Sequence, residues 1–243
     1  MIDVHSHILP WIDDGSRSLE ESMEMLRQEA EQGIQRVVAT PHFYAHHDDL
    51  ERFLLRREYA QKMLREKMAG ENGLPDLSIG AEVYFFQGIS DSELINQLTF
   101  DKKRCILIEM PPSPWPEFVY RELEAIWRRR GITPVVAHID RYIAPFRTHK
   151  IPQRLQQLPV LVQANAEFFL EKATAGMALR MLKAEQIQLL GSDCHNMTSR
   201  PPLIGKAFDV IKKRCGADYL CQMNEFGYSL FDINNHQPSE RKI

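Results

Sequence analysis

The feature that most constrains the fold of this chain is a regular alternation of short apolar runs with helical segments. The apolar runs are rich in Val, Ile and Leu, as in strands that are buried on both faces of a parallel sheet. Seven such units in one unbroken chain predict a closed or nearly closed β/α barrel. The predicted strands are 2–5, 34–40, 77–83, 105–110, 132–138, 159–165 and 187–193.

Helix signals lie between most of these strands. Ser18 and Glu21 form a capping box, and Gly33 follows the same apolar helical face as a predicted C-cap. We expect one domain over residues 1–243, with the polar stretch 224–243 as a surface tail. The other predicted helices are 48–69, 116–130 and 174–184.

Composition excludes several classes of protein. The chain has 243 residues, of which 44% are hydrophobic, and its net charge of −3 gives no long-range attraction to nucleic acid or anionic membranes. The apolar runs are too short to insert into a membrane, and the first residues lack the pattern of a signal peptide. The four cysteines include no C-x2-C pair. We therefore expect a cytoplasmic protein.

Histidines and carboxylates follow six of the seven predicted strands. In a β/α barrel the carboxyl ends of the strands form one rim, where active sites are built. A lone histidine at a strand end is more often structural than functional, but a whole rim of buried charged groups has no packing rationale. The candidate metal ligands are His5, His7, Asp14, His42, Glu82, Glu109, His138, Asp193 and His195.

These candidates are nitrogen and oxygen donors without a thiolate, a set that suits Mn, Fe or Zn. They exceed what one or two ions need. Three divalent ions that share a bridging carboxylate would account for them.

The stretch GSDCHNMTSRPP at 191–202 fits two kinds of chemistry. Cys194 and Arg200 have the C-x5-R spacing of cysteine-dependent phosphatases, whereas Asp193 and His195 fit metal ligands. The cysteine mechanism needs a tight loop whose amides face the phosphate, and that loop usually contains glycine. The intervening HNMTS contains none, and the cysteine mechanism gives the other rim histidines no role. We therefore favour the metal interpretation, with the side chain of Cys194 turned away from the ions.

Six segments together resemble the PHP (polymerase and histidinol phosphatase) superfamily. They resemble most closely the bacterial metal-dependent tyrosine-protein phosphatases of the CpsB/CapC type, which belong to capsule and exopolysaccharide clusters. The resemblance implies the distorted (β/α)7 TIM-like barrel of the PHP fold, with three metal ions, usually Mn or Fe. The segments are MIDVHSHILPWIDDGSRSLEES, ATPHF, GAEVYF, LIEMP, AHIDRY and GSDCHNMTSRPP.

The same resemblance assigns roles to individual residues. Arg141 and Arg200 match arginines that bind the substrate phosphate. Glu82 would bridge the first and second ions. The implied ligand sets are His5, His7, Glu82 and Asp193 for the first ion, Glu82, Glu109 and His138 for the second, and Asp14, His42 and His195 for the third.

The predicted function is hydrolysis of phosphotyrosine on a protein by a metal-bridging hydroxide, without a covalent enzyme intermediate. The resemblance implies a tyrosine kinase of polysaccharide export as the protein partner. Aromatic residues of the rim are candidates to receive the tyrosyl ring. Three alternatives stay open: a phosphatase for a small phosphomonoester such as histidinol phosphate, an amidohydrolase, and a non-catalytic metal-stabilised binding module. The aromatic candidates are Phe43, Tyr44, Tyr84, Trp115 and Tyr142.

Overall fold

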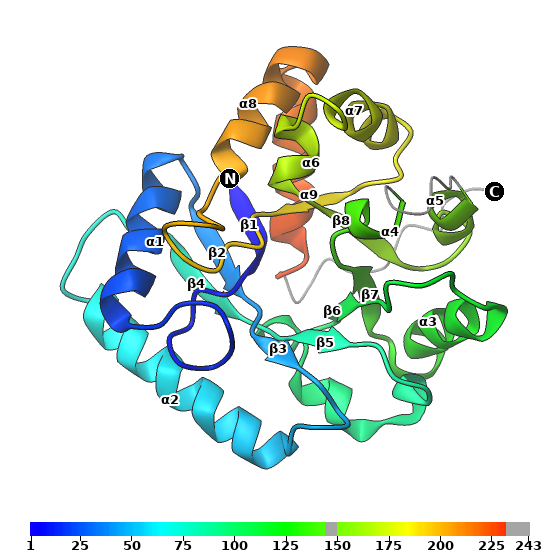
Figure 1. Ribbon diagram of the computed structural model, residues 1–243, viewed down its shortest axis with the longest axis horizontal. Helices are drawn as coiled ribbons and strands as arrows, with labels where there is room; N and C mark the ends of the chain where they lie inside the picture. The colour runs from blue at the N-terminus through cyan, green and yellow to red at the C-terminus, as the bar shows by residue number, and fades with distance from the viewer. Residues whose placement is uncertain (144–149, 232–243) are drawn as a thin grey trace.

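The computed structural model describes residues 1–143 and 150–231 of the chain. Its strands curl around a common axis, and every paired neighbour runs parallel (Figure 1). The strands are β1 (Ile2–Ser6), β2 (Arg36–Ala39), β3 (His42–Phe43), β4 (Asp76–Ile79), β5 (Glu82–Tyr84), β6 (Cys105–Glu109), β7 (Thr133–Val136), β8 (Leu161–Asn165) and β9 (Leu189–Gly191).

Two of the seven predicted strands are each divided into two segments. Thr40 and Pro41 separate β2 from β3, and Gly80 and Ala81 separate β4 from β5. Proline has no backbone N–H, so it cannot continue the hydrogen-bond ladder. The segments nevertheless stay in line, because β2 pairs with β4 and β3 pairs with β5. The seven strands that were predicted from sequence are therefore confirmed.

The last strand position meets the first one. Ser6 and Cys194 form a parallel bridge, flanked by hydrogen bonds from the backbone N–H of His7 to the Cys194 carbonyl (2.9 Å) and from that of Asp193 to the His5 carbonyl (2.8 Å). The strand order around the ring is thus β1, β2/β3, β4/β5, β6, β7, β8 and β9. This arrangement is the distorted (β/α)7 TIM-like barrel that the sequence predicted.

Helices surround the barrel (Figure 1). Ser18 caps α1 by accepting a hydrogen bond from the N–H of Glu21 (3.1 Å), and Gly33 follows the helix end with a φ of 80°, as predicted. Between β5 and β6 the described chain has 3-10 turns in place of an α-helix. The helices are α1 (Leu19–Glu31), α2 (Leu50–Met68), α3 (Glu117–Arg130), α4 (Asp140–Ile143), α5 (Lys150–Leu155), α6 (Ala166–Leu170), α7 (Ala175–Lys183), α8 (Ile204–Cys215) and α9 (Ala217–Ser229), and the 3-10 turns are Ile89–Asp91, Glu93–Gln97 and Phe100–Lys102.

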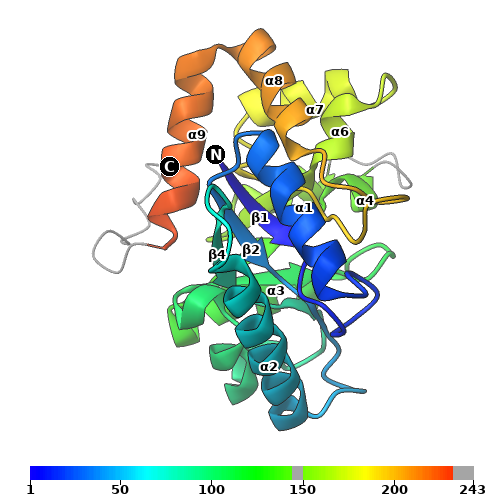
Figure 2. The same ribbon diagram turned by 90° about the vertical axis from the view of Figure 1, so that its left-hand side faces the viewer.

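The predicted surface tail differs from the structure over its first residues. Residues 224–229 belong to α9, which lies beside β1 (Figure 2), and residues 232–243 lie outside the described part of the chain. A Cβ atom at Gly227 would lie 2.8 Å from Cγ2 of Ile2, so helix and strand are in close contact there. Just beyond α9, Leu230 and Phe231 are buried in a cluster with Val4 and other barrel residues.

This cluster of Leu230, Phe231 and inward-facing strand residues forms the apolar floor of the barrel. Phe231 stacks on Phe100 with 6.0 Å between ring centroids, and its carbonyl accepts a hydrogen bond from Lys103. The strand residues of the cluster are Ile2, Val4, Val38, Cys105, Leu107, Val135, Ala137 and Leu189. The floor fills the end of the barrel where the strands begin, which leaves the opposite end for polar groups.

We expect Phe231→Ala to lower the free energy of unfolding by about 3–5 kcal/mol and the melting temperature by roughly 10 °C, because it removes a buried aromatic ring. Differential scanning calorimetry measures the change. Phe226→Ala is the matched control, since that phenylalanine of α9 is 38% exposed. Equal losses of stability in the two variants would contradict a buried role for Phe231.

Candidate metal centre

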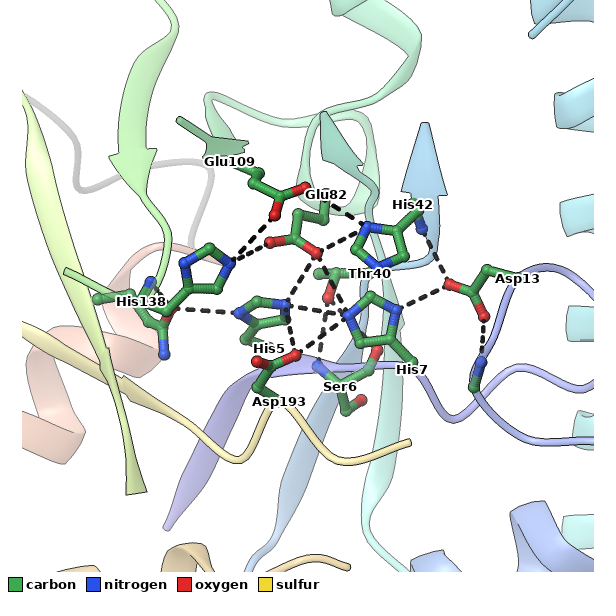
Figure 3. Close-up of polar contacts among 12 residues, drawn as sticks. His5, Ser6, His7, Asp13, Thr40, His42, Glu82, Glu109, His138 and Asp193 are labelled. Atoms are coloured by element: carbon green, nitrogen blue, oxygen red, sulfur yellow. Dashed lines mark hydrogen bonds and ion pairs between the residues drawn. The ribbon is translucent and has the colours of Figure 1, made fainter. Parts of the chain in front are cut away.

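The predicted metal ligands meet at the carboxyl ends of the strands. Figure 3 shows His5, His7, His42, Glu82, Glu109, His138 and Asp193 of this set. His5 lies on β1, His42 on β3, Glu82 on β5 and Glu109 on β6. The remaining candidates directly follow β1, β7 and β9, except Asp14, which comes from the loop between β1 and α1. Parallel strands bring these segments to one rim. Each of the nine predicted side chains lies within 4 Å of at least one other: His5, His7, Asp14, His42, Glu82, Glu109, His138, Asp193 and His195.

Four atoms at the centre of this cluster form a cage. The Nε2 atoms of His5 and His7 lie 3.2 Å apart, and each is 3.3 Å from Oε2 of Glu82. Oδ1 of Asp193 lies 3.5 Å from the first nitrogen and 3.4 Å from the second. Ligands at about 2.0–2.2 Å from a tetrahedral ion would be separated by about 3.3–3.6 Å. The spacing of the donors therefore fits a divalent cation.

Glu82 also faces a second group through its other oxygen. Its Oε1 lies 2.8 Å from Nε2 of His138, which is 3.9 Å from Oε1 of Glu109. A carboxylate with one oxygen in each group has the geometry of a bridge. His42 faces this group as well, since its Nδ1 lies 3.0 Å from Oε2 of Glu82 and 3.8 Å from Oε2 of Glu109.

A third group lies toward the loop after β1. Oδ1 of Asp14 is 3.5 Å from Nε2 of His42 and 3.4 Å from Nε2 of His195. The ring centroids of His7 and His195 are 3.9 Å apart, so the third group adjoins the central cage. The structure thus brings together each of the three ligand sets that the family resemblance implied.

Three buried atoms of the cluster lack a hydrogen-bond partner among the described residues: Nδ1 of His42, Oε2 of Glu82 and Nε2 of His195. Buried polar atoms are nearly always satisfied, so unsatisfied atoms call for an explanation. Burial and the neighbouring charge of His7 lower the pKa of His195 to about 4, which keeps its imidazole neutral and able to bind a cation. Metal ions bound at the separate donor groups would give such atoms partners.

Ionisation of the cluster depends on its own ion pairs. Burial acts to raise the pKa values of Asp193 and Glu82, but the charge of His5 and neighbouring hydrogen bonds hold both well below their usual range. Burial acts to lower the pKa of His7, yet contact with Asp13 raises it well above its usual value. Protonated histidines therefore balance ionised carboxylates. A bound divalent cation would displace these protons, so metal uptake would release protons.

The ring nitrogens of the histidines that face away from the cluster are held in place. Such outer contacts fix the orientation and tautomer of metal-binding histidines. The sequence pattern does not identify these partners, since Gln163 lies in a predicted apolar strand and Tyr142 is only a candidate for ring binding. The contacts are His5 Nδ1 to Gln163 Oε1 (3.2 Å), His7 Nδ1 to Asp13 Oδ2 (2.7 Å), and His138 Nδ1 to the Tyr142 hydroxyl (3.1 Å).

The two predicted phosphate-binding arginines lie at the edge of the cluster. Arg141, from α4, and Arg200, from the loop after β9, both pair with Oδ2 of Asp193, the latter at 2.7 Å. Each side chain is partly exposed. Two guanidinium groups therefore converge on the same carboxylate oxygen at the edge of the cluster.

Only two of the five aromatic candidates face the rim. Phe43, Trp115 and Tyr142 are buried, so they pack inside the protein. Tyr44 and Tyr84 are partly exposed. The ring of Tyr44 stacks on the ligand candidate His42 at 5.5 Å and lies 5.7 Å from the ring of Tyr84. These two tyrosines form an aromatic wall beside the metal-ligand cluster.

Cys194 is unsuited to be a nucleophile. Its side chain is fully buried in the apolar core, and burial raises the pKa of its thiol well above the usual value. The amides of the following loop are also occupied: Oδ1 of Asn196 accepts hydrogen bonds from the N–H groups of Thr198 (2.9 Å), Ser199 (2.8 Å) and Arg200 (3.2 Å). The structure thus opposes the cysteine mechanism, and the Cys194 side chain is turned away from the ligand cluster as predicted.

The fold and this cluster together define a β/α-barrel protein with a candidate metal centre at the carboxyl ends of its strands. Residues 1–225 match the family described as capsular polysaccharide synthesis, CpsB/CapC. The chain belongs to this family, so the predicted resemblance is confirmed. No helix among residues 1–143 and 150–231 has the length and apolar character needed to cross a membrane.

Relatives in sequence and in structure agree with this membership. The chain is 32% identical over 232 residues to tyrosine-protein phosphatase CpsB of Streptococcus pneumoniae, covering 89% of this chain and 92% of that one. It is 28% identical over 235 residues to tyrosine-protein phosphatase YwqE of Bacillus subtilis, covering 93% and 89%. A crystal structure from work on YwqE and CpsB, described as metal-dependent tyrosine phosphatases, superposes with a TM-score of 0.83 at 24% identity, covering 95% and 94% of the two chains. That superposition supports the same fold.

Proposed function

We propose that this chain is a metal-dependent phosphomonoester hydrolase that removes phosphate from phosphotyrosine on a protein. The central cage carries the proposal, because the Nε2 atoms of His5 and His7 lie 3.2 Å apart and each lies 3.3–3.5 Å from a carboxylate oxygen of Glu82 and of Asp193, close enough to share one cation. Family membership and the names of the curated relatives support the substrate class.

The proposed cofactor is a set of three divalent ions, with manganese first and iron or zinc as alternatives. Three adjoining groups of donors among the nine residues support this number: His5, His7 and Asp193; His42, Glu82 and Glu109; and His7, Asp14, His42 and His195. Their imidazole and carboxylate donors suit these metals. The proposed ligands are the nine residues predicted from sequence, with Glu82 as the bridge.

When bound, the ions would supply a hydroxide nucleophile near neutral pH and offset charge on the phosphate. Arg141 and Arg200 would donate hydrogen bonds to phosphate oxygens, because the planar guanidinium group matches an oxyanion with two parallel donors. Each arginine would exchange its contact with Asp193 for the substrate. The wall of Tyr44 and Tyr84 would pack against the tyrosyl ring, and a phenolate leaves readily with little help from an acid.

The proposed partner is a phosphotyrosine protein, and within it a tyrosine kinase of polysaccharide export. The description of the family as one of capsular polysaccharide synthesis supports this choice. The cytoplasm remains the proposed compartment. Four free cysteines, Cys105, Cys194, Cys215 and Cys221, suit a reducing environment.

The proposal is tested by steady-state kinetics of the manganese-loaded protein on a phosphotyrosine peptide and on histidinol phosphate. We expect kcat/KM to favour the peptide by about two- to tenfold, since packing of one aromatic ring contributes about 0.5–1.5 kcal/mol. A preference for histidinol phosphate would assign the site to small phosphomonoesters. Amide or lactone hydrolysis without phosphatase activity would make the protein an amidohydrolase, and metal binding without any turnover would leave a binding module.

A further inference from the structure

A pair of buried carboxyl groups lies behind the metal-ligand cluster, outside the nine proposed ligands. Asp3 of β1 and Glu29 of α1 are both fully buried, and a carboxyl oxygen of each lies within 4.8 Å of the other and of Sγ of Cys194. Oδ2 of Asp3 and both carboxyl oxygens of Glu29 have no N–H or hydroxyl donor among the described residues. Neither the fold nor the proposed reaction explains why α1 places an acidic group in this apolar position.

Two adjacent buried carboxyl groups are tolerated when one of them keeps its proton. Burial raises the pKa of Glu29 well above its usual value, and the charge of Asp3 raises it further. Oδ1 of Asp3 accepts two backbone N–H bonds whereas the carboxyl oxygens of Glu29 accept none among the described residues, so Glu29 is the neutral partner, with a proton that it can donate to Oδ2 of Asp3. This contact satisfies an oxygen that would otherwise be buried without a partner, which is costly.

The other oxygen of Asp3 joins the two strands that close the barrel. Oδ1 accepts hydrogen bonds from the N–H of His5 on β1 (3.1 Å) and from that of Ser192 beyond β9 (2.9 Å). One of these residues is a proposed ligand of the central cage, and the other immediately precedes Asp193, a second ligand. The carboxylate of Asp3 therefore ties together the backbone on both sides of the cage.

We propose that Glu29 is a positioning residue for the metal centre, which acts through Asp3 to fix the spacing between His5 and Asp193. The inference rests on the proposed metal-dependent function. Without the hydrogen bond from Glu29, the carboxylate of Asp3 is free to rotate, and the closure of β1 on β9 loosens. Loss of such outer contacts lowers metal affinity by about 10–100-fold.

The test is calorimetric titration of manganese into metal-free protein, with thermal unfolding of each variant alongside. Glu29→Ala removes the donor, and we expect its manganese affinity to fall by about tenfold or more. Glu29→Gln keeps an N–H donor for Oδ2 of Asp3, and we expect its affinity to stay within about threefold of the wild type. Met25→Ala is the control, since it removes a fully buried side chain from the same helix.

We expect the control to melt at a lower temperature and to bind manganese as the wild type does. Equal affinity in Glu29→Ala and Met25→Ala would overturn the positioning role. So would a loss of affinity in Glu29→Gln, which stays informative even if Glu29→Ala does not fold. A wild-type protein that takes up no divalent metal would instead overturn the metal-dependent function, and the positioning role with it.

Discussion

Glu82→Gln is expected to lower kcat on a phosphotyrosine peptide by roughly 10³-fold or more. The substitution keeps the shape of the side chain but removes the charge between the two groups of donors. Oε2 of Glu82 lies 3.3 Å from each histidine nitrogen of the central cage, and Oε1 lies 2.8 Å from His138. Metal ions supply several kcal/mol of transition-state stabilisation, and each 1.36 kcal/mol is a factor of ten in rate.

Stopped assays at saturating manganese measure this loss, and plasma emission spectrometry counts the metal ions that each protein retains. We expect Glu82→Gln to retain fewer ions than the wild type and to melt at a lower temperature, because it leaves buried histidines without their carboxylate partner. Glu66→Gln, a change on the exposed face of α2, is the control. Activity within tenfold of the wild type in Glu82→Gln would rule out a bridging role.

Metal removal is expected to abolish turnover, whereas loss of the Cys194 thiol is expected to leave turnover nearly unchanged. Dialysis against a chelator is expected to abolish turnover of p-nitrophenyl phosphate, and added manganese to restore it. Cys194→Ser is expected to keep kcat within about threefold, because its thiol is buried, with a raised pKa, and faces away from the ligand cluster. The serine hydroxyl would lie beside the buried carboxyl groups of Asp3 and Glu29, outside the ligand cluster, so the chemistry is unchanged.

Progress curves recorded for the chelated protein, the manganese-restored protein and Cys194→Ser decide between the metal mechanism and the cysteine mechanism. Asp193→Ala serves as the positive control for loss of activity, since Oδ1 of Asp193 belongs to the central cage. If the chelated protein kept its turnover while Cys194→Ser lost it, the nucleophile would be sulfur and the metal mechanism would be wrong.

Much of the fold could be predicted because the signals are local. The apolar pattern of each strand and helix indicates which of its residues are buried, and seven repeats of the strand–helix unit predict a barrel. The two breaks at Pro41 and Gly80 were not predicted: the strand predicted at 34–40 ends before β3, and the strand predicted at 77–83 continues through Gly80. The floor of the barrel was missed for another reason. Leu230 and Phe231 lie within a polar stretch, and their burial depends on the size of the opening that distant strands leave.

The candidate ligands could be predicted because the carboxyl ends of parallel strands lie at the same rim of the barrel, so residues at those ends are close in space. Their outer partners could not. Gln163 lies on β8, the strand without a histidine or carboxylate at its end, and it also accepts a hydrogen bond from the N–H of His138 (2.7 Å). A polar side chain in the apolar run PVLVQAN was the available signal. Glu29 occupies a helix position that reads as exposed, and only the packing of α1 against the barrel shows otherwise.

The floor of the barrel also bears on where the folding unit ends. The family match stops at residue 225, yet Leu230 and Phe231 close the apolar end of the barrel. A protein shortened to the family boundary would keep every proposed ligand and both arginines while exposing the inner faces of several strands. The segment that matches the family is therefore shorter than the segment that completes the apolar core of the barrel. A truncation at the family boundary would remove residues that the core needs.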